Sequence, residues 1–166
     1  SGLCTGLLVS SERLASQIGV GSMCFSAFSA LFLVIYYSLF GQPQMIHGFS
    51  WINLPSFSCS MGFLVDGLSL VMLLRVSFVS LLVHVYSIRY MSDETGFVRF
   101  FSLISLFTFA MLFLVTTDNL VGLFFGWEGV SLFSYAWIGF YYAKDSAASA
   151  GLKAFLINRF GDCAFC

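Results

Sequence analysis

Long stretches without charged side chains are the feature that most limits how this chain can fold. Residues 19–40 contain no Asp, Glu, Lys or Arg. A helix needs about 20 consecutive, mostly apolar residues to cross a bilayer. Charged residues make up 9% of the chain, whereas an ordinary soluble domain has roughly a quarter. We therefore expect an all-α protein that is integral to a membrane.

The hydropathy pattern predicts a bundle of about five transmembrane helices. Four complete spans are expected at residues 19–40, 63–86, 100–115 and 120–142, and a fifth helix begins near Ala148 and continues to the chain end. Residues 41–60 hold both prolines and several polar side chains, which predicts a polar loop. Residues 3–9 are apolar and could be the tail of an earlier span, but they are too few to decide.

We divide the chain into residues 1–61, which hold this stub, the first full span and the loop, and residues 62–166, which hold the later helices. The chain starts at Ser1 without Met and stops within an apolar run, so we expect a fragment of a longer protein.

Basic residues indicate the orientation, because Lys and Arg concentrate in loops on the inner side of a membrane. The loops expected at one end contain Arg13, Arg89, Arg99 and Lys144, and the loops at the other end contain no Lys or Arg.

Several functional classes are disfavoured by composition. The net charge is −1, which gives no electrostatic footprint for nucleic acid. The five cysteines do not have the spacing of a metal or iron–sulfur site, and no GxGxxG or flavin motif is present. We expect the cysteines to be small apolar side chains and the chain to hold neither a metal nor a cofactor.

Glu128 is the residue that most needs a functional explanation. It lies three residues from the midpoint of the predicted 120–142 span, or ~4.5 Å along a helix. A charge at this depth is costly and usually marks a functional site. Gly122 and Gly126 form a small-xxx-small pattern that allows another helix to approach closely. We expect the carboxylate to face a packed interior, either as part of a proton relay or as a protonated group that bonds a neighbouring helix.

The fifth helix carries three further ionisable residues. Arg159 and Asp162 are separated by three positions and can pair on one helix face. Lys153 lies one or two turns in from the inner surface, where it could join a proton path or extend to the interface.

Four more ionisable residues have less specific roles. Asp66 and Asp118 lie near the outer ends of their spans, where each could face water or cap a helix. His84 is expected to be a structural histidine. Arg75 lies mid-span, and its partner must come from another helix, another chain or lipid headgroups, because Asp66 is on the opposite side of the helix.

Several motifs resemble a known family, most strongly from about residue 62 onward. They are VDGLSLVMLL (65–74), HVYSIRYMSDETGFVRFFSL (84–103), TTDNLVGLFFGWEGVSLFSYAWIGFYYAKD (116–145) and GLKAFLINRFGDCAF (151–165). In order and spacing they are similar to the N-terminal part of subunit 5 of the proton-pumping NADH:ubiquinone oxidoreductase, respiratory complex I.

The resemblance implies an antiporter-like membrane subunit with two inverted repeats of five helices, of which this chain would hold only the start. In that family the Glu of the GWEG motif pairs with a Lys on a later, broken helix and helps to move protons. Glu128 occupies this position, and Lys153, Arg159 and Asp162 match charged family positions. Arg75 matches none, and Ser131 stands where Gly is frequent.

The resemblance also implies the partners and the reaction. The enzyme activity would be that of the whole NADH:ubiquinone reductase, with NAD, FMN and iron–sulfur clusters in other subunits and ubiquinone as the substrate of the complex. Expected partners are other membrane-arm subunits, lipids and a second chain that completes subunit 5.

Two alternatives remain open: a subunit of a multi-subunit cation/proton antiporter, which shares this fold, and a structural fragment needed only for assembly. Frequent Phe and Cys with scarce Lys resemble the bias of an organellar genome, so we expect the mitochondrial inner membrane, with a bacterial plasma membrane as the alternative.

Overall fold

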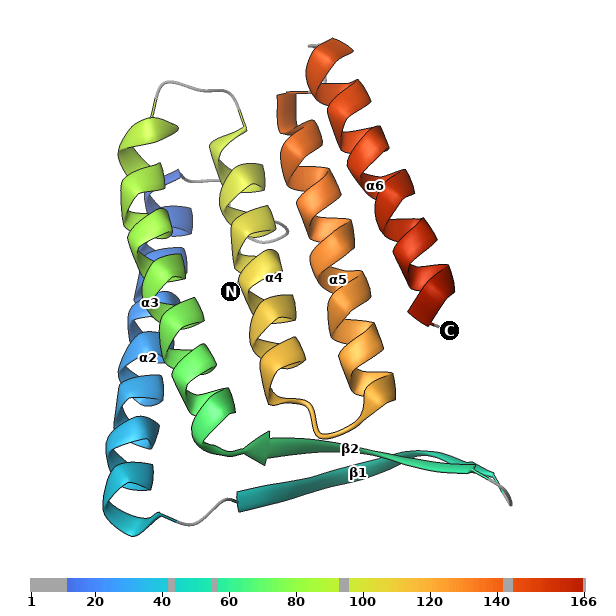
Figure 1. Ribbon diagram of the computed structural model, residues 1–166. Helices are drawn as coiled ribbons and strands as arrows, with labels where there is room; N and C mark the ends of the chain where they lie inside the picture. The colour runs from blue at the N-terminus through green and yellow to red at the C-terminus, as the bar shows by residue number, and fades with distance from the viewer. Residues whose placement is uncertain (1–11, 42–43, 55–56, 93–95, 142–144, 166) are drawn as a thin grey trace.

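The structure, a computed structural model, describes residues 12–41, 44–54, 57–92, 96–141 and 145–165. In these residues five α-helices stand side by side and a β-hairpin lies across one end of the bundle (Figure 1). The predicted stub at residues 3–9 falls outside them. The helices are α2 (Glu12–Phe40), α3 (Gly67–Tyr90), α4 (Phe97–Thr116), α5 (Leu120–Ile138) and α6 (Asp145–Phe165), with a 3-10 turn η1 (Gly139–Tyr141) after α5.

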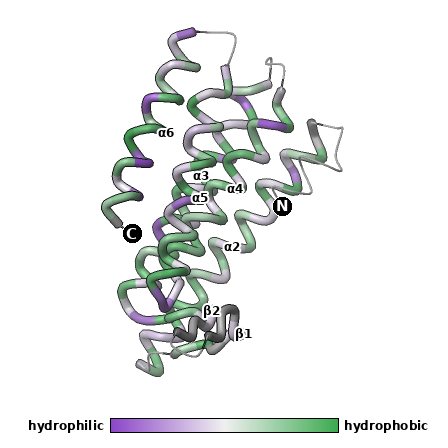
Figure 2. Tube along the Cα trace, turned by 90° about the vertical axis from the view of Figure 1, so that its right-hand side faces the viewer, coloured by the Kyte–Doolittle hydropathy of each residue, from purple (hydrophilic) through white to green (hydrophobic). Residues whose placement is uncertain are grey.

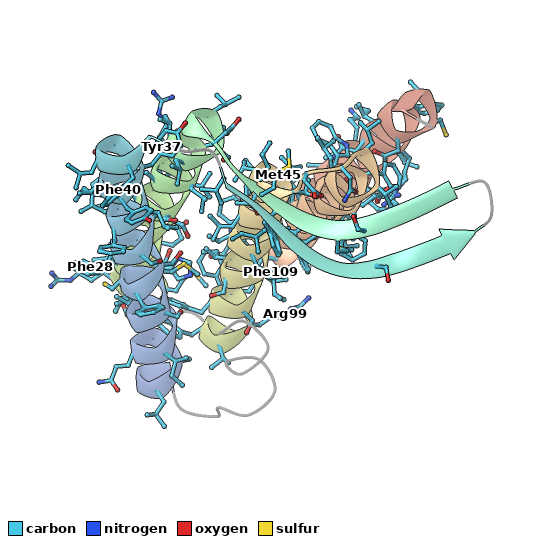
Figure 3. The ribbon with its side chains drawn as sticks, turned by 90° about the horizontal axis from the view of Figure 1, so that it is seen from below. Phe28, Tyr37, Phe40, Met45, Arg99 and Phe109 are labelled. Atoms are coloured by element: carbon cyan, nitrogen blue, oxygen red, sulfur yellow. The ribbon has the colours of Figure 1, made fainter. Side chains whose placement is uncertain are left out.

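The prediction of a helical membrane bundle is confirmed. Three helices in the described part of the chain are long and apolar enough to cross a membrane: Leu14–Phe40, Gly67–Tyr90 and Phe97–Thr116. Helices α5 and α6 form where spans were expected but do not belong to this set. Viewed from the hairpin end, Figure 3 shows Phe28 and Phe40 on the side of α2 turned away from α4. Their exposed fractions of 73% and 63% suit a surface that faces lipid.

The prediction of a polar loop at residues 41–60 is wrong. Strands β1 (Gln44–Leu54) and β2 (Phe57–Val65) pair antiparallel in this segment, with register irregularities between His47 and Ser50 and between Ser50 and Ile52. The expected start of the second span at residue 63 is also wrong, because residues 63–65 belong to β2. Helix α3 starts at Gly67, where Asp66 forms a capping box with Ser69.

The hairpin is fastened to the turn between α4 and α5. An isolated two-stranded hairpin is only marginally stable, so these contacts matter. Asn119 Nδ2 donates to the Ser60 carbonyl at 2.7 Å, and Phe63 forms a bridge with Thr117 and an edge-to-face contact with Phe113. The same asparagine accepts a hydrogen bond from Gly122 N and thereby caps α5. The hairpin, the end of α4 and the start of α5 are therefore held together by one set of contacts around Asn119.

The buried face of α3, which packs against α2 and α4, is mostly polar. Five of the six buried residues of α3 carry a hydroxyl or imidazole, and the sixth is Leu70. The apolar core lies at the end opposite the hairpin, where aromatic side chains of α4 and η1 meet the end of α3. Its buried members are Met91, Phe97, Phe100, Phe101, Ile104 and Phe140.

Candidate functional site

Glu128 of α5 is paired with Arg159 of α6. The distance from Arg159 Nη1 to Glu128 Oε1 is 2.5 Å. The Arg159 side chain is 40% exposed and the Glu128 side chain is 22% exposed. Helix α6 packs against α5 and η1, so the face of α6 that carries Arg159 meets the middle of α5. Helix α5 contains no Lys or Arg. The cation that pairs with Glu128 is therefore supplied by the next helix, α6.

Asp162 joins the same pair from one turn further along α6. Its Oδ2 lies 3.5 Å from Arg159 Nη1, and its Oδ1 accepts a hydrogen bond of 3.1 Å from Trp127 Nε1. Only 7% of the Asp162 side chain is exposed. Arg159 Nε is buried and has no hydrogen-bond partner in the described part of the chain. Two carboxylates thus share one guanidinium.

Neighbouring contacts orient α6 on α5. Asn158 Nδ2 donates to Ser131 Oγ at 3.0 Å, and the Arg159 guanidinium lies 4.7 Å from the centre of the Phe155 ring. The α6 residues that take part follow a spacing of three and four, so they share one helix face. Figure 2 shows the corresponding alternation of hydrophilic and hydrophobic segments along α6. We name Trp127, Glu128, Ser131, Asn158, Arg159 and Asp162 the α5–α6 cluster.

Two family models match the chain around this cluster and before it. The first, described as NADH-Ubiquinone oxidoreductase (complex I), chain 5 N-terminus, matches residues 51–101. The second, described as NADH:quinone oxidoreductase/Mrp antiporter, TM, matches residues 117–166 and so includes the whole α5–α6 cluster. This chain belongs to the complex I chain 5 family.

Similar proteins carry the corresponding names. NADH-quinone oxidoreductase subunit L of Rickettsia bellii is 44% identical over 99% of this chain and 26% of the relative. Subunit L of Neisseria meningitidis serogroup A is 53% identical over 70% of this chain and 18% of the relative. NADH-ubiquinone oxidoreductase chain 5 of Dictyostelium citrinum is 42% identical over 91% of this chain and 23% of the relative. The chain therefore spans about a quarter of the length of such relatives.

The four predicted site residues of this chain 5 family member do not all come together. Glu128, Arg159 and Asp162 meet in the α5–α6 cluster. Lys153 is exposed and forms no ion pair within the described residues. It precedes Asp162 by nine positions, which places the two residues on opposite sides of α6.

Of the two glycines in the predicted small-xxx-small pattern, Gly126 lies against α4, whereas a Cβ atom added at Gly122 would meet Thr117 and Asn119. A Cβ atom added at Gly126 would lie 2.8 Å from Leu114 Cβ, and one added at Gly129 would lie 3.1 Å from Ala110 Cβ. Real carbon atoms rarely pack so tightly, so only glycine allows this spacing at Gly126. The contact positions the backbone on both sides of Glu128.

Two acidic residues lie at the hairpin end. Asp66 is the N-cap of α3, which is one of the two roles expected for it from the sequence. Hydrogen bonds from the backbone N–H and the hydroxyl of Ser69 hold the pKa of Asp66 below its ordinary value of 3.8. Asp118 does not cap α5, because Asn119 does; its carboxylate accepts a hydrogen bond from the Asn119 side chain instead.

His84 lies at the centre of a network that sequence reasoning missed. Its side chain is fully buried, with Nδ1 2.8 Å from the Ser80 carbonyl and Nε2 3.1 Å from Ser105 Oγ. Ser80 Oγ is 2.7 Å from Thr108 Oγ1, and Ser26 Oγ on α2 is 3.4 Å from Ser77 Oγ. A regular spacing of polar residues on α3 was the available signal. We name these residues the α2–α4 polar network.

Proposed function

We propose that this chain is part of the proton-translocating membrane arm of complex I and that the α5–α6 cluster is one element of the proton path. The observation that carries the proposal is the unequal charge of the cluster: Glu128 and Asp162 both contact the single cation Arg159. With all three groups ionised the cluster carries one excess negative charge in a medium of low dielectric. Such a charge is costly, and binding one proton removes it.

The geometry also favours the transfer of a proton between the two carboxylates over its retention at one of them. Arg159 Nη1 is hydrogen-bonded to Glu128 at 2.5 Å and is 3.5 Å from Asp162, so a small rotation of the guanidinium exchanges the closer partner. The carboxylate released by this rotation loses its counter-charge, and in the proposed path a proton takes the place of the guanidinium there. Lys153 would contribute at a separate step, once further helices cover its exposed face.

The proposal extends to the assembly. The redox groups, NAD, FMN and iron–sulfur clusters, would lie in other subunits, and ubiquinone would be the substrate of the complex. The remaining helices of subunit 5 would come from a longer form of this polypeptide or from a second chain. The membrane would be an energy-coupling one, with the mitochondrial inner membrane as our proposal and a bacterial plasma membrane as the alternative. The bacterial relatives fit the second choice.

The test is the substitution Glu128→Gln in the intact complex, reconstituted into sealed vesicles. We expect NADH-driven acidification, followed with a pH-sensitive dye, to fall relative to the rate of quinone reduction. The matched control is Asp145→Asn, because Asp145 is an exposed acid at the start of α6 outside the cluster. Full proton pumping by Glu128→Gln would contradict the proposal and favour a purely structural role in assembly.

A cation/proton antiporter subunit is the second candidate, because the family model that includes the cluster is named for both functions. This reading predicts proton exchange that depends on Na⁺ and needs no NADH. The same vesicles, energised by a Na⁺ gradient in place of NADH, discriminate between the two.

A further inference from the structure

An apolar groove runs between α3 and α4. Its volume is about 320 Å³. The α3 residues in its wall follow a spacing of three and four, so the groove runs along the helix axis over two turns, or ~10 Å. Trp137 of α5 also lines it. The apolar wall is made by Val76, Val79 and Val83 of α3 and by Ile104, Phe107 and Met111 of α4.

Two polar residues in the wall do not make the groove polar. Ser80 and Thr108 line it, but their hydroxyls are 2.7 Å apart and bond each other. Ser80 Oγ also lies 3.3 Å from His84 Nδ1. Because these groups are already satisfied, the groove offers a hydrocarbon surface. Cavities of this kind stay dry and take up apolar ligands.

Arg75 adds a single cation to this apolar groove. Its side chain is exposed and lines the groove, and it has no ion pair or hydrogen bond with any residue that the structure describes. It lies eight residues after the start of α3, or ~12 Å along the helix. Helical side chains lean toward the N-terminal end of the helix, so the guanidinium is directed toward the hairpin end of the bundle.

We propose that this groove binds one acyl chain of an anionic phospholipid, whose phosphate is held by Arg75. A helix of 24 residues is ~36 Å long and the hydrocarbon of a bilayer is ~30 Å thick, so Arg75 lies ~9 Å below the hydrocarbon edge at the hairpin end. The leaning side chain and local thinning of the bilayer bring guanidinium and phosphate together at this depth. The acyl chain of the same lipid then continues along the groove toward Val83.

Charge and availability favour a lipid over another protein segment. A guanidinium matches a phosphate with two parallel hydrogen bonds. A partner helix would have to bring its own carboxylate into the hydrocarbon, which is energetically costly. Phosphate, by contrast, is present at the edge of every bilayer. The direction of the groove, parallel to the helices, is also the direction of an acyl chain.

The test uses the intact complex in phosphatidylcholine vesicles that contain spin-labelled phosphatidylglycerol. Electron spin resonance measures the motionally restricted lipid per complex. We expect Arg75→Gln to lose one restricted phosphatidylglycerol per copy of this chain and Arg75→Lys to retain it. Spin-labelled phosphatidylcholine should show no difference between these variants. An unchanged restricted population in Arg75→Gln, or an equal loss of both lipids, overturns the proposal.

A second pair of variants tests the groove itself and keeps the arginine. Val79→Trp fills the groove and should displace the restricted lipid, whereas Phe78→Trp changes a neighbouring side chain that is 55% exposed and does not line it. Equal effects of the two substitutions contradict the proposal. If cross-linking instead places a carboxylate of another helix on Arg75, a protein segment occupies the site and the proposal fails. None of these outcomes depends on proton pumping.

Discussion

The two polar regions of this bundle solve the same problem in opposite ways. Both place polar groups between helices where water is scarce. The α2–α4 polar network consists of a neutral ring system and hydroxyls, and both ring nitrogens of His84 have partners. The α5–α6 cluster contains three charged groups, with one carboxylate in excess, and a buried Arg159 Nε that has no partner among the described residues. A satisfied network fixes helices, whereas an unbalanced one can change partners.

The largest effect is expected from His84→Ala, which breaks the neutral region. It leaves a cavity and removes the partners of Ser80 and Ser105, for a loss of about 3 kcal/mol in unfolding free energy. The measurement is the thermal unfolding midpoint of the detergent-solubilised complex. Tyr86→Ala is the control, because Tyr86 is on the same helix and is 69% exposed. Equal destabilisation by both substitutions would mean that the network contributes little.

Gly126→Ala tests the contact that joins the two regions through α4. The added Cβ would lie 2.8 Å from Leu114 Cβ and 2.9 Å from its Cα, and overpacking of this kind costs about 1–3 kcal/mol. We expect a lower unfolding midpoint and weaker proton pumping, because the backbone beside Glu128 must move. In Gly21→Ala the new Cβ meets nothing within 4 Å, so this control should be neutral or slightly stabilising. A neutral result for Gly126→Ala would show that the two helices separate easily.

How much of each region was predictable follows from the range of its interactions. The glycine spacing lies within one helix, so the close approach at Gly126 could be predicted from it. The depth of Glu128 in the membrane stays a prediction. The Glu128–Arg159 pair depends on how α5 and α6 rotate against each other, which neither helix encodes by itself. The Arg159–Asp162 pair, with both residues on one helix, was predicted.

The hairpin and the polar network were missed for different reasons. Prolines and scattered polar residues gave residues 41–60 the composition of a loop, and strand pairing requires contacts between distant residues and with Asn119. The network was readable in principle, because Ser77, Ser80, His84 and Ser87 repeat at three and four on one face. Taken singly, the three serines are small residues in an apolar span, and His84 was expected to be a structural histidine without an assigned partner.

A smaller effect is expected from Trp127→Phe, which changes one hydrogen bond of the charged α5–α6 cluster. It keeps the aromatic ring but removes the hydrogen bond from Nε1 to Asp162 Oδ1, for a loss of about 1 kcal/mol. Asp162 then depends on Arg159 alone and should compete better for it against Glu128. We expect a change in the ratio of protons pumped to NADH oxidised, with little change in the unfolding midpoint. Trp137→Phe is the control outside the cluster, and identical behaviour of the two variants would argue against the role of this bond.

The smallest effect concerns Asp66, a carboxylate that is held at a helix end rather than between helices. Its pKa is lowered below 3.8 by hydrogen bonds from the backbone and the side chain of Ser69. A lowered folded-state pKa means that the ionised cap stabilises α3 above about pH 4. This stabilisation is lost as the pH falls below 3.8 and passes the folded-state value. The contribution is about 0.3–1 kcal/mol, as for an exposed charge near a helix start.

Asp66→Asn isolates this contribution, because asparagine caps a helix equally well but does not titrate in this range. We expect the unfolding midpoints of the parent and the variant to differ more at pH 7 than at pH 3, with the parent gaining relative to the variant as the pH rises between these values. Every other acid in the chain titrates alike in both proteins and cancels in the difference. A difference that is the same at both pH values would show that the charge of Asp66 adds nothing to its hydrogen bond. The neutral and charged ways of ending a helix would then be equivalent here, in contrast to the interior of the bundle.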